Sequence, residues 1–353
     1  MSPLPPTLRR ERLAEFDYLR GMAIVMIVLG HSIFLAQPVF PALLENLLRG
    51  GTGLFVFISG FFFHRVFYAR FDYSEFIAKK AKALLIPFIV ISLFALSIRM
   101  LGWWQEGLSW QQNLLNAWYT LRNGYVLYPH WYVPFILITF LCSPLHLIYI
   151  RTHASWQIAV LIVFSLAALL LHRPQSNSNF FQSLIYFTPY YLLGILFSQY
   201  EQPLRRWHWP LLIVSLSVIA ITAIVQTYVW VHLGNYHKAA FEYQGWDLQF
   251  IQVLFGCIAM LALCRHIHWR WLQRHLCWLA ELSFPIFFIH PLLTIALENL
   301  VALETIKSFF PVSGMGTSLL VFTAVFLVQF YGSAGIAVLV RAIAKRNSRF
   351  IVG

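Results

Sequence analysis

Long apolar blocks recur along the whole chain, and they constrain its fold more than any other feature. Each block is about 17 to 25 residues long, the length that a helix needs to cross the roughly 30 Å hydrocarbon core of a bilayer. Of the 353 residues, 59% are hydrophobic and only 11% are charged, whereas a soluble domain carries roughly a quarter charged residues. So few charges cannot cover a globular surface, and a soluble fold is therefore excluded.

The blocks predict an all-α, polytopic membrane protein of about ten transmembrane helices, because a spanning segment must satisfy its own backbone hydrogen bonds. The predicted spans are residues 19–36, 53–70, 83–101, 131–150, 155–172, 183–200, 209–231, 248–264, 282–302 and 317–341. The first block follows arginines but is long and lacks a clear cleavage site. We therefore expect it to be a retained helix rather than a removed signal peptide.

Lysines and arginines divide unevenly between alternate connections. With the spans numbered in chain order, most of them lie in the N-terminal tail, in the C-terminal tail, and in the loops between spans 2 and 3, 6 and 7, and 8 and 9. These are called the 2–3, 6–7 and 8–9 loops. The opposite connections carry only Arg49, Arg122, Arg173, Lys238 and Lys307. Because cytoplasmic loops are enriched in positive charge, we expect a multi-pass protein of the cell inner membrane with both termini cytoplasmic. The net charge of +12 then reflects topology and membrane lipids as neighbours, and no nucleic-acid partner is expected.

The cysteines give no sign of a disulfide framework or a metal site. All four lie in or beside apolar segments: Cys142, Cys257, Cys264 and Cys277. The 8–9 region does combine two of these cysteines with His266, His268 and His275, which are ligand types that zinc uses. Arginines interleave these residues, however, and we expect no metal there.

Two outer connections are rich in aromatic residues. Residues 102–130 and 232–247 hold most of the loop tryptophans and tyrosines. Such residues form interfacial belts at membrane surfaces, and they could equally provide a surface on which sugars stack. Both interpretations stay open on the sequence alone.

The first span contains two groups that suggest chemistry. Arg20 and His31 are eleven residues apart, so at about 100° per residue they project from nearly the same helix face, separated by about 16 Å along the axis. An arginine at the inner mouth can clamp an anion, and a deeper histidine can act as a general base. Asp17 lies one turn before Arg20 and could orient it. The competing interpretation is structural, with Arg20 reaching lipid phosphate and His31 bonding a neighbouring helix.

The second span and the loop after it add further candidates. Ser59-Gly60 permits close helix approach, and Arg65 follows. Lys79 and Lys82 lie in the 2–3 loop, where they serve topology or bind phosphate. His290 lies in the ninth span with Glu298 two turns later, and we expect a buried polar pair that shapes a cavity.

These motifs resemble the acyltransferase-3 family of membrane enzymes that O-acylate cell-surface glycans. Asp17-Tyr18-Leu19-Arg20-Gly21 with His31 is similar to the family's Arg-x10-His motif, and Phe55-Val56-Phe57-Ile58-Ser59-Gly60-Phe61 to its second-helix motif. Later landmarks are His130-Trp131, Tyr191-Leu192-Leu193-Gly194 and Ser283-Phe284-Pro285-Ile286-Phe287-Phe288-Ile289-His290-Pro291. The likeness covers residues 14–340, within one predicted domain of residues 1–353.

The resemblance implies a ten-helix fold that uses cytoplasmic acetyl-CoA as acyl donor. It implies that His31 is catalytic and that Arg20 lies on the CoA side. The family's Arg-x-x-Arg cluster is replaced here by Lys79 and Lys82. Asp17, Ser59, Gly60, Arg65, Trp131 and His290 are the expected supporting residues.

We therefore expect an O-acetyltransferase that acts on a hydroxyl of a surface polysaccharide or lipid-linked glycan. An exporter or flippase of polysaccharide is the alternative from another class, although the chain shows neither the repeats nor the broken helices typical of transporters. A non-catalytic assembly partner is the remaining alternative.

Overall fold

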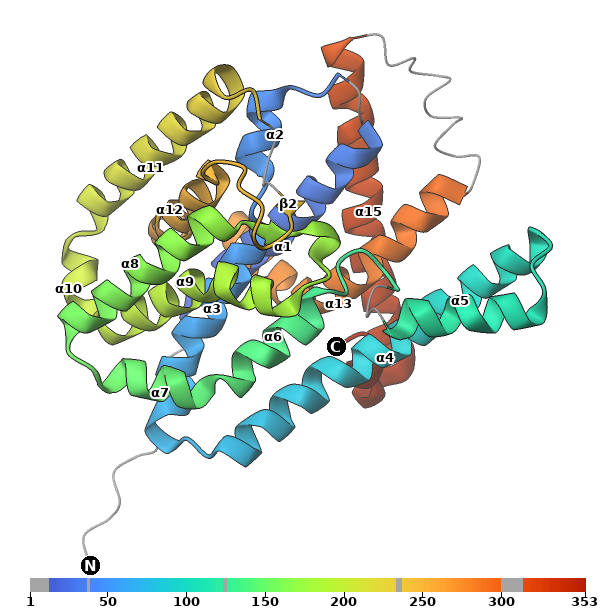
Figure 1. The fold of residues 1–353 in the computed structure, drawn as a ribbon, viewed down its shortest axis with the longest axis horizontal. Coiled ribbons are helices and arrows are strands. Elements are labelled where there is room, and N and C mark those ends of the chain that lie inside the picture. The colour runs from blue at the N-terminus through green and yellow to red at the C-terminus, as the bar shows by residue number, and fades with distance from the viewer. Residues whose placement is uncertain (1–12, 37–38, 123–125, 233–236, 300–313) are drawn as a thin grey trace, which may run out of the picture.

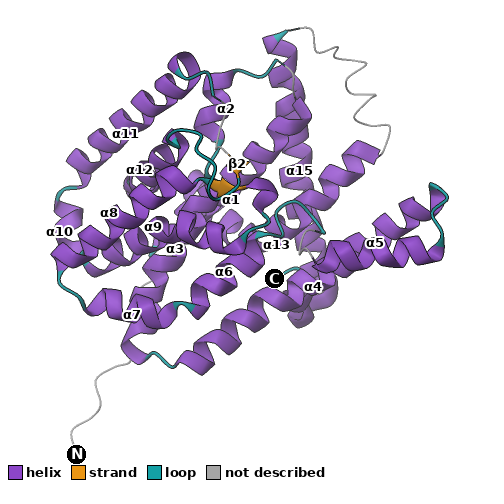
Figure 2. Ribbon diagram, viewed as in Figure 1, coloured by secondary structure: helices purple, strands orange, loops and turns teal. Residues whose placement is uncertain are grey.

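The computed structural model describes residues 13–36, 39–122, 126–232, 237–299 and 314–353. Over this part of the chain the protein is almost wholly helical (Figure 1), with one short two-stranded ribbon as its sheet (Figure 2). The predicted all-α class is therefore confirmed.

The helices follow one another with short connections. In the first half they are α1 (Ala14–Ala36), α2 (Ala42–Leu48), α3 (Gly51–Phe62), α4 (Tyr73–Gln105), α5 (Trp110–Arg122), α6 (Tyr132–Leu141), α7 (Ser143–Arg151) and α8 (Ala154–Leu171). In the second half they are α9 (Phe180–Gln199), α10 (Glu201–Arg206), α11 (His208–Ile224), α12 (Leu248–Arg265), α13 (Arg270–Asn299), α15 (Met315–Ala344) and α16 (Ser348–Ile351). The strands β1 (Arg173–Pro174) and β2 (His237–Lys238) pair in parallel.

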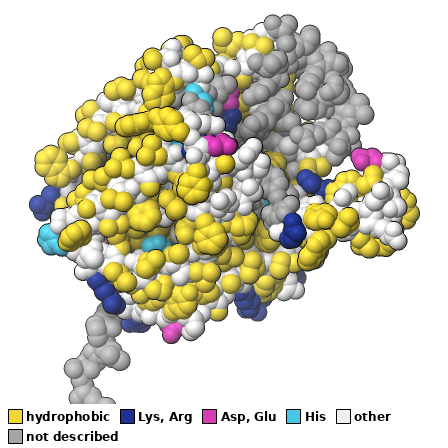
Figure 3. Space-filling view, in the orientation of Figure 1, with side chains coloured by type: hydrophobic (Ala, Val, Ile, Leu, Met, Phe, Trp, Pro, Cys, Tyr) yellow, Lys and Arg dark blue, Asp and Glu magenta, His cyan; other side chains and the backbone are white. Residues whose placement is uncertain are grey.

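The described residues contain 9 helical segments that are long and apolar enough to cross a membrane, or 10 if the bent pair α6 and α7 counts as one span. The polytopic prediction is confirmed, and each predicted span overlaps one of these segments, with residues 300–302 of the ninth span outside the described residues. Their outward faces are apolar, as lipid contact requires: Trp156 and Val163 of α8 and Ile213 of α11 are exposed. Hydrophobic side chains cover much of the surface in Figure 3, with few lysines and arginines among them.

The predicted span 131–150 is broken into two helices, so the expectation that the chain has no broken helices is wrong. Its two halves, α6 and α7, meet at an angle of 53° near Cys142. Pro144 lies in the first turn of α7. It has no N–H to donate, and its ring would clash with the carbonyl four residues earlier if α6 continued through this point. The chain therefore ends one helix and begins another at this point.

Three other predicted boundaries also differ. The second span is regular only to Phe62, after which Phe63–Phe67 form a π-helical turn and Tyr68–Arg70 a 3-10 turn. The connection 102–130 contains α5, which projects from the body beside the end of α4 (Figure 1). Much of the predicted 8–9 loop is the start of α13, which begins at Arg270.

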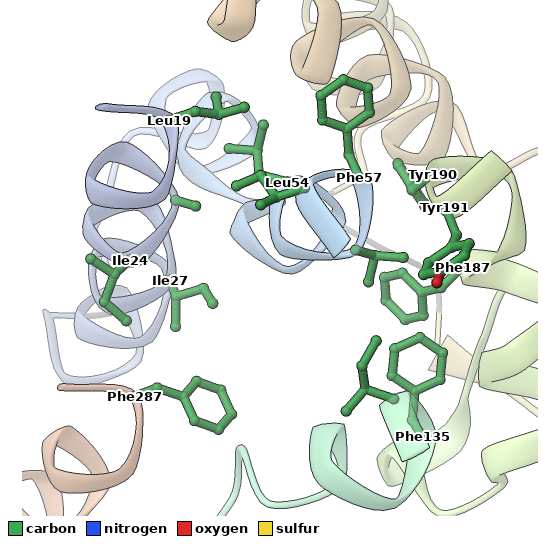
Figure 4. Close-up of a cluster of buried hydrophobic side chains, with 14 of the residues drawn as sticks. Leu19, Ile24, Ile27, Leu54, Phe57, Phe135, Phe187, Tyr190, Tyr191 and Phe287 are labelled. Carbon is green, nitrogen blue, oxygen red and sulfur yellow. The ribbon is translucent and has the colours of Figure 1, made fainter. Parts of the chain in front are cut away.

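One hydrophobic cluster unites the helices around α1, α3 and α9. Figure 4 shows it filled by side chains from α1, α3, α6, α9 and α13. The α3–α9 crossing is close because two glycines face it. A Cβ at Gly60 would lie 2.0 Å from Tyr191 O, and a Cβ at Gly194 would lie 2.1 Å from Phe57 O. The helix-approach role predicted for Gly60 is thus observed.

Candidate active site

A cavity of about 460 Å³ lies where α1, the start of α3 and α13 meet the segment before α6. This volume is within the range of small-molecule sites. His31 lines the cavity, as do Tyr128, Trp131 and Tyr132. Ile27, Phe187, Tyr190 and Phe287, all seen in Figure 4, supply apolar wall. The cavity therefore combines two histidines, His31 and His237, with aromatic and apolar surfaces.

His31 is hydrogen-bonded to His290, with 2.9 Å between His31 Nδ1 and His290 Nε2. His290 Nδ1 in turn lies 2.9 Å from the carbonyl oxygen of Ile286. A carbonyl can only accept, so Nδ1 of a neutral His290 carries the proton and its Nε2 accepts one from His31. The second nitrogen of His31, Nε2, then holds the lone pair, which is the arrangement that a general base needs.

Two prolines interrupt the backbone hydrogen bonding of α13. Pro291 has no N–H, so the carbonyl of Phe287, four residues earlier in α13, receives no amide proton from it. Pro285 likewise releases the carbonyl of Glu281, which accepts from the Arg341 guanidinium at 2.8 Å. The carbonyl freed by Pro285 thus ties α13 to α15.

A chain of buried hydrogen bonds continues from this pair toward α15. Thr294 Oγ1 donates to the carbonyl of His290 (3.1 Å) and therefore accepts from Gln329 Nε2 (2.7 Å) and from the Tyr128 hydroxyl (3.0 Å). Ser32 contacts Gln329 Oε1 at 2.6 Å. Satisfied buried networks of this kind hold their members in one arrangement, so the rings of His31 and Tyr128, whose centroids are 4.6 Å apart, are fixed against each other.

Arg20 lies toward the other end of α1 and also faces α13. Its guanidinium donates to Ser283 Oγ at 3.4 Å, seven residues before His290. Gly21 allows this contact, because a Cβ there would lie 2.7 Å from the carbonyl oxygen of Leu276. The predicted common face of Arg20 and His31 is therefore observed, and it is the face that α1 presents to α13.

Basic side chains also gather at the cavity. Arg49, Arg99 and Arg173 are all among its lining residues. The Arg173 guanidinium lies 5.0 Å from the ring centroid of Trp131 and 5.6 Å from that of Phe187. Its position inside the protein lowers the pKa of Arg173, with Tyr186 and Asp247 opposing this shift and Arg49 adding to it.

The comparison with protein families decides the assignment. The family model described as "Acyltransferase domain", that of acyltransferase 3, matches residues 13–338, nearly the whole chain. The chain belongs to the acyltransferase-3 family. No curated protein and no solved structure matches it. The protein is thus an acyltransferase with membrane-spanning helices.

The remaining predicted site residues of this acyltransferase are dispersed. Lys79 pairs with Glu75 at 2.5 Å on the exposed face of α4, and Lys82 lies over the ring of Phe350 at 5.6 Å. Arg65 pairs with Glu201 at 3.4 Å. None of these three lines the cavity. Asp17 is partly buried near the start of α1, and the Glu298 side chain lies outside the described residues.

The other supporting residues lie close to the acyltransferase cavity. Ser59 donates to the Phe55 carbonyl at 2.8 Å, and its side chain lies near that of Tyr132, a cavity residue. Trp131 is buried beneath Arg173. Of the loop aromatics, Tyr128 turns into the cavity, whereas Trp104, Trp110 and Trp118 of the α4–α5 region are exposed.

Two groups of residues were missed in the sequence. Lys80 was counted only for topology, yet it packs against the rings of Phe67, Phe76 and Phe140 and is an electrostatic neighbour of Arg20. Of the three cavity arginines, Arg49 and Arg173 were noted only as exceptions to the positive-inside rule, and Arg99 was given no role. That exception was itself a signal, since Arg49 and Arg173 are two of the five basic residues predicted outside.

Among the residues described, no three His, Cys, Asp or Glu side chains are grouped closely enough to hold a metal ion. The histidines of the 8–9 region make other contacts in the acyltransferase. His266 stacks on Trp209 with ring centroids 4.5 Å apart, and His275 Nε2 lies 3.2 Å from the Tyr331 hydroxyl.

Proposed function

We propose that the protein transfers an acyl group, acetyl above all, from cytoplasmic acetyl-CoA to a hydroxyl of a surface polysaccharide or lipid-linked glycan. The observation that carries the proposal is the His31–His290 pair at the cavity. It gives His31 a defined tautomer beside a space of ligand size. The same face of α1 bears Arg20, about 16 Å away by helical rise.

In the proposed reaction, His31 Nε2 removes the proton of the acceptor hydroxyl. The oxygen attacks the thioester carbonyl, and the tetrahedral adduct collapses with cleavage of the carbon–sulfur bond. The proton on His31 Nε2 then passes to the departing thiolate, so that free CoA and the ester are formed and His31 returns to its starting state. His290 holds the ring throughout by accepting the Nδ1 proton.

For the donor, we infer that Arg20 and the neighbouring Lys80 receive the anionic part of acetyl-CoA, with Lys79 and Lys82 adding positive charge nearby. Arginine suits this role because its fork of donors matches phosphate oxygens. The orientation that goes with this proposal places both termini in the cytoplasm, in the inner membrane. The cavity, bordered by Arg49 and Arg173 from predicted outer connections, then takes the acceptor from the other side.

The test is acetyl transfer by purified protein in lipid nanodiscs, with labelled acetyl-CoA and an extract of membrane glycans. The His31→Ala variant should lose about 10²- to 10⁴-fold in rate, the usual contribution of a general base, while melting like the wild type. His31→Gln should not restore the rate, because an amide cannot take the proton. The rate of the wild type should fall at low pH along a limb that reports one protonated group.

The matched control is His268→Ala, which removes an exposed histidine between α12 and α13. It should turn over at the wild-type rate. Near-normal turnover by His31→Gln would place the base elsewhere, and a lack of acetyl-CoA turnover by any preparation would favour an export function for the cavity.

A further inference from the structure

The cavity has a one-sided charge. Its described lining residues include three arginines, Arg49, Arg99 and Arg173, and neither Asp nor Glu. They come from three distant parts of the chain: the turn before α3, the second half of α4, and β1. Bringing like charges together is unfavourable, particularly where protein replaces water. Such a convergence at one cavity indicates a site for a negative group.

Arg173 is held in place by the surrounding structure. Its guanidinium stacks on Trp131 and donates to Asn177 Oδ1 at 2.8 Å. Its backbone pairs with that of His237, so two outer connections far apart in sequence fix one another here. His237 Nδ1 donates to the Pro174 carbonyl at 3.1 Å. The arginine is therefore presented by a built platform rather than by a mobile loop.

Two carboxylates interact with these arginines, Asp247 with Arg173 and Glu45 with Arg49. Asp247 Oδ2 accepts from the Tyr186 hydroxyl at 2.9 Å, and its Oδ1 caps the start of α12. Glu45 forms an ion pair with Arg49. The three guanidinium groups outnumber these two carboxylates, so the summed formal charge of the five side chains is positive.

The start of α3 adds to this positive field. Gly50, with φ +119°, makes a left-handed turn directly after Arg49, and α3 then begins at Gly51. Gly50, Gly51, Thr52 and Gly53 all line the cavity. The first amides of a helix have no intrahelical acceptor and carry its positive dipole end. The backbone thus reinforces the arginines at the same place.

We propose that this cavity binds an anionic group of the acyl acceptor, a carboxylate or a phosphate, through Arg49, Arg99 and Arg173. The acceptor is then an acidic sugar or a sugar phosphate, including a sugar linked to a lipid through phosphate. The inference rests on the proposed function and narrows its acceptor. Since His31 lines the same cavity, the hydroxyl that it activates lies within a sugar unit or two of the anionic group.

The test uses the full chain, purified in detergent, and isothermal titration with glucose, glucuronic acid, glucose 1-phosphate and CoA. An acidic probe should bind at least about tenfold more tightly than glucose, as expected of charge-assisted hydrogen bonds. Arg173→Gln should abolish this preference. Arg122→Gln is the matched control, because Arg122 is an exposed arginine also stacked on an aromatic ring, that of Tyr119, but outside the cavity.

Arg99→Gln gives a second measurement if Arg173→Gln does not fold, and it should weaken the preference several-fold. The acidic probe that binds more tightly shows whether the site prefers a carboxylate or a phosphate. Equal binding of glucose, or a preference that survives both substitutions, would overturn the proposal. So would loss of CoA binding in Arg173→Gln, because the cavity would then serve the donor. Intact binding of acidic probes without any acetyl transfer would instead count against the proposed function alone.

Discussion

The basic groups at the two ends of α1 have different surroundings: those at the cavity beside His31 and those near Arg20. At the cavity, Arg49, Arg99 and Arg173 border a space of about 460 Å³. At the other end, Arg20 is hydrogen-bonded to Ser283, and the half-buried Lys80 lies against aromatic rings. Neither residue lines that space. One end is shaped to receive a ligand in this conformation, whereas the other is packed.

This difference indicates which part has to move during catalysis. If the donor enters beside Arg20, the packing around Lys80 must open before a thioester reaches His31. The helix that carries Lys80 has few protein neighbours to hold it, because only 28% of the most apolar stretch of α4 is buried inside the protein. The acceptor side needs no comparable change.

The largest effect concerns the orientation of the two ends, which should be all or none. In a variant whose native cysteines are replaced by alanine, Lys79→Cys should react with a membrane-impermeant maleimide only after permeabilisation. Tyr243→Cys should react in intact cells, since Tyr243 is exposed in the predicted outer connection before α12. Labelling of position 79 from outside would invert the comparison and assign the cavity to the cytoplasm.

The second experiment tests whether the cavity end is organised for chemistry by His290. His290→Leu removes the acceptor of the His31 Nδ1 proton and should lower kcat about 10- to 100-fold, the usual effect of losing such an orienting partner. The KM for acetyl-CoA should stay unchanged. His290→Gln, whose amide oxygen can accept the same proton, should recover part of the rate. Equal kcat values in the two variants at equal melting temperatures would mean that His290 only fills space.

The fold was largely predictable because its main determinant is local. A run of apolar residues predicts a spanning helix wherever it occurs, and the angle between Arg20 and His31 depends on α1 alone. The bend between α6 and α7 was also local, and Pro144 could have predicted it. The sequence predicted that Gly60 permits a close helix approach, but residue spacing could not show that Gly194 lies on the other side of the contact.

The site was only partly predictable because its geometry is non-local. His31 and His290 were each singled out, yet nothing in their spacing of 259 residues shows that the rings touch. The convergence of Arg49, Arg99 and Arg173 depends on packing of α3, α4 and β1. Lys79, Lys80 and Lys82 looked alike in sequence, whereas the structure gives each a different environment.

The third experiment concerns Arg20 at the packed end. Arg20→Ala should raise the KM for acetyl-CoA about 10- to 100-fold, because a hydrogen bond to a charged group contributes roughly 1.5–3 kcal/mol. Arg20→Lys should recover little, since the fork of donors is lost. Ser283→Ala, which removes one hydrogen-bond partner of Arg20 in the observed conformation, is the matched control and should change KM little. An unchanged KM in Arg20→Ala would remove the donor from this end.

The smallest effect separates the lysines. Lys80→Met keeps the length of the side chain and its contact with Phe67, Phe76 and Phe140 but removes the charge beside Arg20. Replacing an enclosed cation by an apolar group is often neutral or stabilising, so the variant should melt no lower than the wild type. The KM for acetyl-CoA should nevertheless rise about three- to tenfold, a loss of the order of one hydrogen bond.

Lys79→Met is the matched control for this last measurement. Lys79 and Glu75 are 67% and 62% exposed, and an ion pair at such a surface contributes about 0–1 kcal/mol. The KM should therefore change less than about twofold, which is within the energy of one surface pair. Equal effects of the two substitutions would show that only diffuse positive charge matters at this end. A larger effect of Lys79→Met would mean that the donor binds on the outer face of α4, and the packed end would then not have to open.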